Sequence, residues 1–226
     1  MIPTPSLGHL TRSDLRRVYE PAEDSFALLD ALEADADALR TSLGTSAPLC
    51  VEIGSGSGVI TAFLAQILGA TAAAYVAIDV NEHANRCTVA TGKHNGVRIE
   101  AARASLLSAL QPRAREKIDV LLFNPPYVPT EEEEEQMAQH DKDIAGAWAG
   151  GATGTKLVDA LIDHGVIADA LAPNGRFYLV AIKQNDPEGI VSRLCSQALQ
   201  AEVVLKRRAG GEHLHIIRAI KPGSNK

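Results

Sequence analysis

Val51-Glu52-Ile53-Gly54-Ser55-Gly56-Ser57-Gly58 is the stretch of sequence that decides the fold. Apolar residues at 49–53 predict a strand, and the apolar run that follows predicts a helix over residues 58–68, so the glycines lie in the turn between the two. Glycine lets the backbone turn sharply and approach a ligand closely. Because ligands of open α/β sheets bind at the carboxyl ends of strands, we expect this loop to hold a ligand.

The rest of the chain alternates short apolar runs with amphipathic patterns. From Glu23 onward, apolar residues recur at three- and four-residue steps, which predicts a helix carrying Phe26, Leu29, Leu32, Ala36 and Leu39 on one face. Further helices are expected over residues 81–94, 155–171 and 186–199. Further strands are expected over residues 74–79, 97–101, 118–123, 176–182, 202–206 and 213–219.

This alternation predicts an α/β fold, in which a largely parallel sheet is covered by helices on both faces. The last two strands have no helix between them, so they should form an antiparallel hairpin at one edge of the sheet. We therefore predict a Rossmann-like domain with a seven-stranded mixed sheet. Residues 18–226 should form this single domain, and residues 1–17, which carry two prolines and no clear period, should form an irregular N-terminal arm.

The composition limits the kinds of partner. The 226 residues carry a formal net charge of −6, whereas a protein that binds a phosphate backbone usually has a basic surface. We therefore expect no direct binding of nucleic acid. No apolar run approaches the length of a membrane span, so no membrane association is expected either.

The cysteines and histidines indicate a compartment and argue against a metal. Cys50, Cys87 and Cys195 form no CxxC pair, which indicates reduced thiols in a reducing compartment. The expected location is the cytoplasm, with the nucleus as a second compartment. His213 and His215 would share one face of a strand, but no third ligand lies near them in the sequence, so we expect no metal site.

The glycine spacing distinguishes two kinds of cofactor. In the dinucleotide fingerprint G-x-G-x-x-G, Gly54 and Gly56 fit the first two positions, but the third falls on Val59. The sequence instead has the pattern E-x-G-x-G-x-G, beginning at Glu52, which resembles motif I of the class I methyltransferases. An acid and a tight loop suit S-adenosylmethionine, a cationic cofactor without phosphates, and Asp79 is placed for the ribose hydroxyls of either cofactor. A nicotinamide cofactor and a purely structural loop are the alternatives.

Asn124-Pro125-Pro126-Tyr127 follows the most apolar strand, again at a carboxyl end. An NH₂ group conjugated to a carbonyl is a poor nucleophile, because its lone pair is delocalised. The Asn124 side-chain oxygen and a backbone carbonyl, most simply that of Pro125, can accept its two hydrogens and aim the nitrogen. Tyr127 supplies a flat face, so catalysis would come mainly from orientation in a fixed polar environment. A rigid turn at a strand exit is the alternative.

The two motifs together resemble the HemK-like glutamine N5-methyltransferases. The resemblance is carried by Tyr19-Glu20-Pro21-Ala22-Glu23-Asp24-Ser25-Phe26, by Phe123-Asn124-Pro125-Pro126-Tyr127-Val128, and by Ala147-Trp148-Ala149-Gly150-Gly151 with Gly154. Only a short stretch precedes Tyr19, and in this the chain resembles the eukaryotic and archaeal branch of that family. The resemblance implies methylation of the glutamine in the Gly-Gly-Gln loop of class 1 translation termination factors, and a small zinc-binding activator subunit that adds a strand to an edge of the sheet. Histone lysine methylation is also attributed to that branch.

The resemblance also implies roles for individual residues. Contacts to the cofactor are implied for Ser25, Glu52, Gly54, Gly56, Asp79, Ser105 and Leu106. Catalytic roles are implied for Asn124, Pro125 and Tyr127, and substrate contacts for Asn124, Pro126, Tyr127 and Trp148. Ser105 departs from the family, which usually has an acid that binds the adenine amino group at this position, so cofactor binding would be weaker by about 1 kcal/mol.

The loop after the tetrad carries two further candidates. Glu131–Glu135 would attract a basic substrate or form only a solvated run of charge, and Trp148 is either a wall of the substrate pocket or a packing anchor. Lys206, Arg207 and Arg208 are typical of an edge strand that stays soluble.

We therefore predict methyl transfer from S-adenosylmethionine to the side-chain amide of a glutamine in a class 1 peptide-chain release factor. The chain would be the catalytic subunit of a heterodimer with the activator. Methylation of a lysine and methylation of an RNA or DNA base are alternatives within the same enzyme class. A non-catalytic methyltransferase fold that only binds a partner is the alternative outside it.

Overall fold

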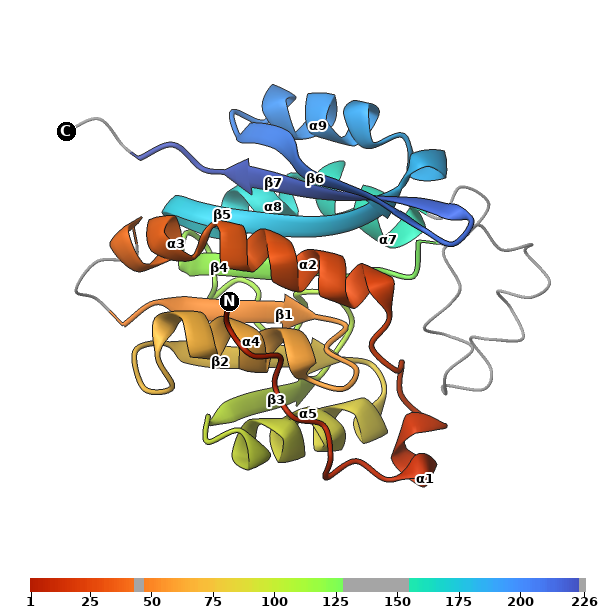
Figure 1. Ribbon diagram of the computed structural model, residues 1–226. Coiled ribbons are helices and arrows are strands. Elements are labelled where there is room, and N and C mark those ends of the chain that lie inside the picture. The colour runs from red at the N-terminus through yellow and green to blue at the C-terminus, as the bar shows by residue number, and fades with distance from the viewer. Residues whose placement is uncertain (43–46, 128–154, 224–226) are drawn as a thin grey trace.

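The computed structural model describes residues 1–42, 47–127 and 155–223. These residues form a seven-stranded sheet with the order β3-β2-β1-β4-β5-β7-β6 (Figure 1). The strands are β1 (Leu49–Ile53), β2 (Ala74–Asp79), β3 (Ile99–Arg103), β4 (Ile118–Phe123), β5 (Leu171–Ile182), β6 (Gln200–Ala209) and β7 (Glu212–Ile220). The first five strands pair in parallel, and β7 runs antiparallel to both β5 and β6. The predicted mixed sheet with its C-terminal hairpin is therefore confirmed.

Helices cover both faces of this sheet. They are α1 (Arg12–Leu15), α2 (Glu23–Ala34), α3 (Ala36–Ser42), α4 (Val59–Leu68), α5 (Glu82–His94), α7 (Lys156–Ile162), α8 (Val166–Ala170), the 3₁₀ turn η2 (Lys183–Asn185) and α9 (Pro187–Ser196). One buried core joins α2, α3 and α4 to the sheet, and a second joins α7, α8 and α9 to the opposite face. Helix α5 packs against β2 and β3 beside α4 (Figure 1). Among the described residues, no helix is long and apolar enough to cross a membrane.

Helix starts follow the predicted capping signals more closely than helix ends do. Asn81 caps α5 by accepting a hydrogen bond from the His83 N–H, and Asp186 caps α9 through the Gly189 N–H. The helix expected over residues 155–171 is two helices, because Gly165 between them adopts φ +65°. The strand expected at 97–101 lies two residues further along, at Ile99–Arg103.

The long helix expected from Glu23 is also two helices, α2 and α3. Asp35 ends α2, where its N–H bonds the Ala31 carbonyl. The buried face of α2 centres on Leu28 and Leu32, both 0% exposed, so Phe26 lies at its border and is 38% exposed. The apolar stripe predicted from three- and four-residue steps was therefore wrong at Phe26.

A group of charged and polar side chains holds the junction between α2 and α3 against the sheet. Arg218 of β7 bonds both carboxylate oxygens of Asp35 at 2.6 Å, and the Tyr178 hydroxyl donates to Asp35 at 2.6 Å. Arg176 of β5 lies 3.8 Å away, and the charged side chains of this group are 10–19% exposed. A carboxylate this far from water needs these partners, because an unpaired buried charge is costly.

The N-terminal arm runs along α5 instead of projecting from the domain. Ser6 bonds Asn95, and His9 lies 3.1 Å from the Thr91 hydroxyl. Residues 12–15, expected to be irregular, form the short helix α1, because Thr11 and Asp14 make a reciprocal capping box.

We expect Asp35→Asn to lower the free energy of unfolding by about 2–4 kcal/mol, because it leaves Arg218 and Arg176 without their shared anion. Chemical denaturation followed by circular dichroism measures this change. The matched control is Asp37→Asn, which removes a fully exposed carboxylate two residues away and should change stability by less than about 0.5 kcal/mol. Equal effects of the two substitutions would contradict this account of the junction.

A candidate active site at the carboxyl ends of the strands

The glycine loop and the Asn-Pro-Pro-Tyr tetrad lie side by side. Strands β1 and β4 are parallel neighbours with Ile53 opposite Phe123, so Gly54 and Asn124 follow at the same edge of the sheet. A Cβ on Gly54 would lie 3.9 Å from the Asn124 carbonyl oxygen. Two segments separated by about seventy residues therefore meet at the carboxyl ends of the strands, where ligands of such sheets bind.

The backbone of the loop requires glycine. Gly54, Gly56 and Gly58 all have positive φ, which L side chains rarely adopt. At Gly58 a Cβ would also lie 2.8 Å from Thr88 Cα of α5, which is closer than atoms of this kind approach. The loop is thus held tightly between β1 and α5, and exposed Gly54 and half-buried Gly56 can approach a ligand.

Asp79 fastens this loop to the end of β2. Its Oδ2 accepts a hydrogen bond from the Gly56 N–H at 3.0 Å, and its Oδ1 accepts one from the Asn81 N–H at 2.9 Å. Burial raises the pKa of Asp79, and the backbone N–H donors of Asn81 and Gly56 oppose that shift. Each carboxylate oxygen keeps a further lone pair, so Asp79 can also accept from hydroxyl groups of a ligand.

Glu52 is a buried acid with one oxygen in use. The side chain is 1% exposed, and its Oε2 accepts hydrogen bonds from the Thr61 N–H, at 3.0 Å, and the Thr61 hydroxyl. Its buried Oε1 has no hydrogen-bond partner among the described residues. Desolvation raises the pKa of Glu52 to about 8. A positively charged ligand nearby would favour the ionised form, so this acid suits a cationic cofactor.

Asn124 is held by a second buried acid, Asp24 at the start of α2. Asp24 is 3% exposed, and its Oδ2 accepts a hydrogen bond from Asn124 Nδ2 at 2.8 Å. A carboxylate only accepts, so the amide nitrogen of Asn124 must face it. The Asn124 Oδ1 therefore points the other way, and no described residue donates to it. This arrangement presents a fixed acceptor with an unused lone pair.

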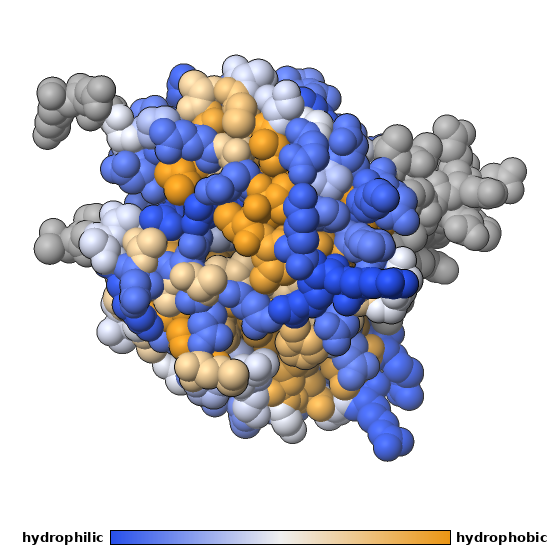
Figure 2. Space-filling model, turned by 45° about the horizontal axis from the view of Figure 1, so that its top comes forward, coloured by the Kyte–Doolittle hydropathy of each residue, from blue (hydrophilic) through white to orange (hydrophobic). Residues whose placement is uncertain are grey.

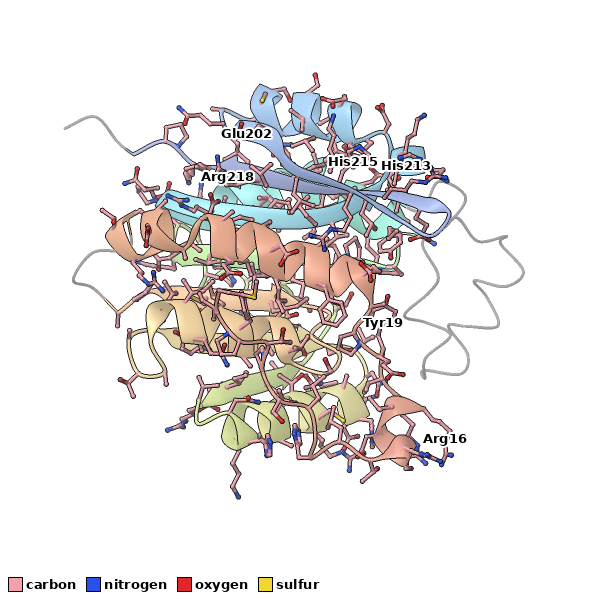
Figure 3. All side chains as sticks on the ribbon, in the orientation of Figure 1. Arg16, Tyr19, Glu202, His213, His215 and Arg218 are labelled. Carbon is pink, nitrogen blue, oxygen red and sulfur yellow. The ribbon has the colours of Figure 1, made fainter. Side chains whose placement is uncertain are left out.

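The other oxygen of Asp24 collects donors from the segment that precedes the loop. Oδ1 accepts from the Tyr19 hydroxyl at 3.0 Å, from the Ser25 N–H at 2.7 Å and from the Ser25 hydroxyl at 3.3 Å. Tyr19 lies in the connection between α1 and α2, at the strand ends (Figure 3). Burial and the charge of Asp24 raise the pKa of Tyr19, so this phenol stays protonated and donates.

Tyr127 closes the tetrad and is tied to the neighbouring strand. Asn185 donates through Nδ2 to the Tyr127 carbonyl at 2.9 Å and accepts through Oδ1 from the Ile182 N–H at 2.8 Å. The Tyr127 side chain is 9% exposed, and burial, followed by the charge of Asp24, raises its pKa. Pro125 is buried and Pro126 half-buried between these fixed ends.

The remaining predicted site residues have different positions. Ser25 is buried beside Asp24, whereas Ser105 is exposed just after β3 and Leu106 is half-buried with φ +49°. Trp148 and Glu131–Glu135 lie outside the described residues.

Sequence reasoning missed Asp24, Tyr19 and Asn185. For Asp24 the available signal was its place directly before Ser25 in the quoted segment. An acid in the first turn of a helix is usually explained by its favourable interaction with the helix dipole. Asp24 occupies such a position but is buried, which that explanation does not predict.

Comparison with known proteins decides the family. Residues 28–142 match the family described as Methyltransferase small domain. Methyltransferase HEMK2 of Mus musculus is 42% identical over 220 residues, covering 97% of this chain and 97% of that protein. The eRF1 methyltransferase catalytic subunit mtq2 of Schizosaccharomyces pombe is 37% identical, covering 99% of this chain and 98% of that protein. The chain belongs to this methyltransferase family.

A solved structure supports the same assignment in three dimensions. The structure of the E. cuniculi Mtq2-Trm112 complex, described as responsible for methylating the eRF1 translation termination factor, covers 90% of this chain and 98% of the matched chain. The TM-score is 0.64 at 28% identity. The methyltransferase therefore uses S-adenosylmethionine as its methyl donor, and the spare oxygen of Glu52 with the carboxylate of Asp79 fits that cationic, ribose-bearing group.

We expect Glu52→Gln to stabilise the cofactor-free methyltransferase at alkaline pH while weakening cofactor binding. The folded protein holds a proton on Glu52 up to about pH 8, whereas the unfolded chain releases it near pH 4.5. Stability contributed by this group therefore falls as pH rises between those values. The free energy of unfolding of the variant should exceed that of the parent increasingly as pH rises toward 8, by at most about 5 kcal/mol.

Thermal melts between pH 5 and 9 measure this divergence, and isothermal titration with S-adenosylmethionine measures the loss of affinity. Glu100→Gln on β3 removes an exposed carboxylate and serves as the control. A stability difference between the Glu52 variant and the parent that stays constant over the whole pH range would contradict this account of Glu52.

Proposed function

We propose that this methyltransferase acts on the side-chain amide of a glutamine in the Gly-Gly-Gln loop of a class 1 translation termination factor. The observation that carries the proposal is the orientation of Asn124. Because Asp24 holds Asn124 Nδ2 at 2.8 Å, Asn124 Oδ1 is committed to accepting a hydrogen bond from a substrate. An NH₂ group is the ligand that such an acceptor binds.

The amide of glutamine needs orientation more than it needs a base. Its nitrogen lone pair is delocalised into the carbonyl, so it must be turned toward the methyl group that the sulfonium of S-adenosylmethionine supplies. Asn124 Oδ1 and the carbonyl of Pro125 would each accept one N–H, and Tyr127 would pack its flat ring against the flat amide. As the nitrogen gains the methyl group it becomes acidic, so its proton can leave to water without a strong general base.

Lysine fits this site less well than glutamine does. An ammonium group would need an unused anionic oxygen, and the Asp24 carboxylate already accepts from Tyr19, Ser25 and Asn124. A lysine also has no flat group for Tyr127 to contact. Methylation of a nucleic acid base agrees poorly with the net charge of −6. A purely binding role gives no reason for the hydrogen bond by which Asp24 orients the Asn124 amide.

The relatives suggest the partners. The S. pombe relative is named as the catalytic subunit of an eRF1 methyltransferase, and the E. cuniculi relative was solved with Trm112. We infer that this chain likewise methylates a class 1 release factor as one half of a heterodimer, and that its small partner is a zinc-binding activator. Translation termination takes place in the cytoplasm, so we place the enzyme there, with a nuclear fraction for any histone substrate. Trp148 remains a predicted substrate contact, and Glu131–Glu135 remain either an attractor of a basic substrate or a solvated run of charge.

Of the two sheet edges, β3 is the better candidate for pairing with the activator. At the other edge, β6 carries Lys206, Arg207 and Arg208, and Figure 2, in which the β6 end of the molecule comes forward, shows apolar residues interrupted by hydrophilic ones. Two large apolar side chains near β3 are instead exposed. They are Val80, directly after β2, and Val89, on α5, which are 57% and 45% exposed. An added strand at β3 would extend the sheet and cover apolar surface beside it.

Methyl transfer from labelled S-adenosylmethionine to a recombinant termination factor tests the proposal. The reaction is run with and without the activator, on the intact factor and on a factor whose Gly-Gly-Gln glutamine is replaced by alanine. Label on the intact factor and none on the replaced one is the expected result. Equal labelling of both factors would remove the glutamine assignment, and labelling of neither by an enzyme that binds the cofactor would remove the termination factor as substrate.

We expect Asp24→Asn to reduce kcat for this transfer by about 100-fold, because an amide at position 24 can donate as well as accept and no longer fixes the orientation of Asn124. The affinity for S-adenosylmethionine should change much less. Asp30→Asn, on the same helix but half-exposed, should leave kcat within about twofold. Steady-state kinetics would count against the positioning role if Asp24→Asn retained the parent kcat.

A further inference from the structure

Three side chains that can bind a metal ion meet where the N-terminal arm joins α5. Asp14, His83 and Cys87 each offer one ligand atom, and the three atoms lie within 4.8 Å of one another. His83 and Cys87 are four residues apart on α5 and so share one face of the helix. Asp14 comes from α1, nearly seventy residues earlier in the chain. Elsewhere in the described residues, no other group of three such side chains comes together.

The carboxylate of Asp14 is already oriented as a ligand. Its Oδ2 accepts hydrogen bonds from the Thr11 N–H at 2.8 Å and the Thr11 hydroxyl at 2.7 Å. Its Oδ1 therefore points at α5 and lies 3.0 Å from His83 Nε2. The bonds from Thr11 thus hold the carboxylate in place. Partners of this kind around a ligand commonly fix its direction in metal sites.

The thiol of Cys87 has no competing role. Cys87 is 4% exposed, and within the ranges that the structure describes its Sγ makes no hydrogen bond. As a free thiol, Cys87 carries an S–H proton when no metal is bound. A bound divalent cation would displace that proton to solvent, because only the thiolate is a strong ligand.

We propose that Asp14, His83 and Cys87 bind one Zn²⁺ ion that clips α1 to α5. A thiolate, an imidazole and a carboxylate together form a ligand set that binds Zn²⁺ in preference to Mg²⁺ or Ca²⁺. The side chains of His83 and Asp14 keep 21% and 25% of their surface exposed, so water can reach the fourth tetrahedral position. Zinc–ligand bonds are about 2.0–2.3 Å long. Small shifts of the three side chains, whose ligand atoms already lie within 4.8 Å of one another, would bring all three to the ion.

The clip would strengthen a joint that borders the cofactor loop. Asn81, two residues before His83, donates through Nδ2 to the Arg17 carbonyl at 2.7 Å and through its N–H to Asp79 Oδ1. Zinc would therefore hold the arm at Asp14 beside the same turn that positions Asp79. Arg16, which follows α1 directly, is exposed at this end of the molecule (Figure 3).

Titration of the metal-free full chain with Co²⁺, followed by Zn²⁺, tests the site. We expect a thiolate-to-cobalt charge-transfer band that saturates at one equivalent and disappears when zinc displaces the cobalt. Cys87→Ser should abolish the band, and His83→Gln should weaken metal affinity at least tenfold while leaving the circular dichroism spectrum unchanged. The matched controls are Cys195→Ser, an exposed thiol on α9, and His94→Gln, at the other end of α5, and both should behave as the parent.

Limited proteolysis gives a second readout that needs no absorbance band. Trypsin cleavage after Arg16 and Arg17 should slow at least threefold when one equivalent of Zn²⁺ is added to the parent, and should not respond in His83→Gln. No cobalt–thiolate band in the parent, a band that survives Cys87→Ser, or equal metal affinities of the parent and His83→Gln would each overturn the proposal.

Discussion

A carboxylate that is 3% exposed must be surrounded by donors, and the donors around Asp24 determine the geometry of the active site. They come from Tyr19, from Ser25 and from Asn124 at the end of β4. The buried charge thus joins the start of α2 to the catalytic strand end and decides which way the Asn124 amide faces. Replacing that anion by any group that can donate would free the amide to turn, so the proposed mechanism depends on this one contact.

The cofactor loop and the substrate tetrad depend on the sheet for their proximity. Because β1 and β4 are adjacent parallel strands, the loop predicted to hold the cofactor and the carbonyl proposed to receive the amide emerge next to each other. The two acids of the cofactor side, buried Glu52 and half-buried Asp79, are held differently. Asp79 is satisfied by two backbone N–H groups, whereas Glu52 keeps an oxygen without a described partner. The site therefore has its unsatisfied acceptors, Glu52 Oε1 and Asn124 Oδ1, where ligand groups are expected.

Much of the fold could be predicted from local sequence, because strand and helix periodicity and capping residues act over a few positions. The strands at 74–79 and 118–123 and the caps at Asn81 and Asp186 are of this kind. The break at Gly165 and the exposure of Phe26 depend on how helices sit on the sheet, which periodicity does not record. Burial of Asp24 was missed for the same reason. The meeting of Asp14 with His83 and Cys87 joins distant segments, so spacing along the chain gave no metal signal.

The account rests on Asn124 presenting its oxygen to a substrate amide while Asp24 holds its nitrogen. A crystal structure of the protein with S-adenosylhomocysteine and a Gly-Gly-Gln peptide measures both contacts at once. The predicted result is the glutamine NH₂ within hydrogen-bond distance of Asn124 Oδ1 and of the Pro125 carbonyl, with Asn124 Nδ2 still on Asp24 Oδ2. A glutamine bound with its carbonyl toward Asn124, or an Asn124 side chain turned away from Asp24, would contradict the account.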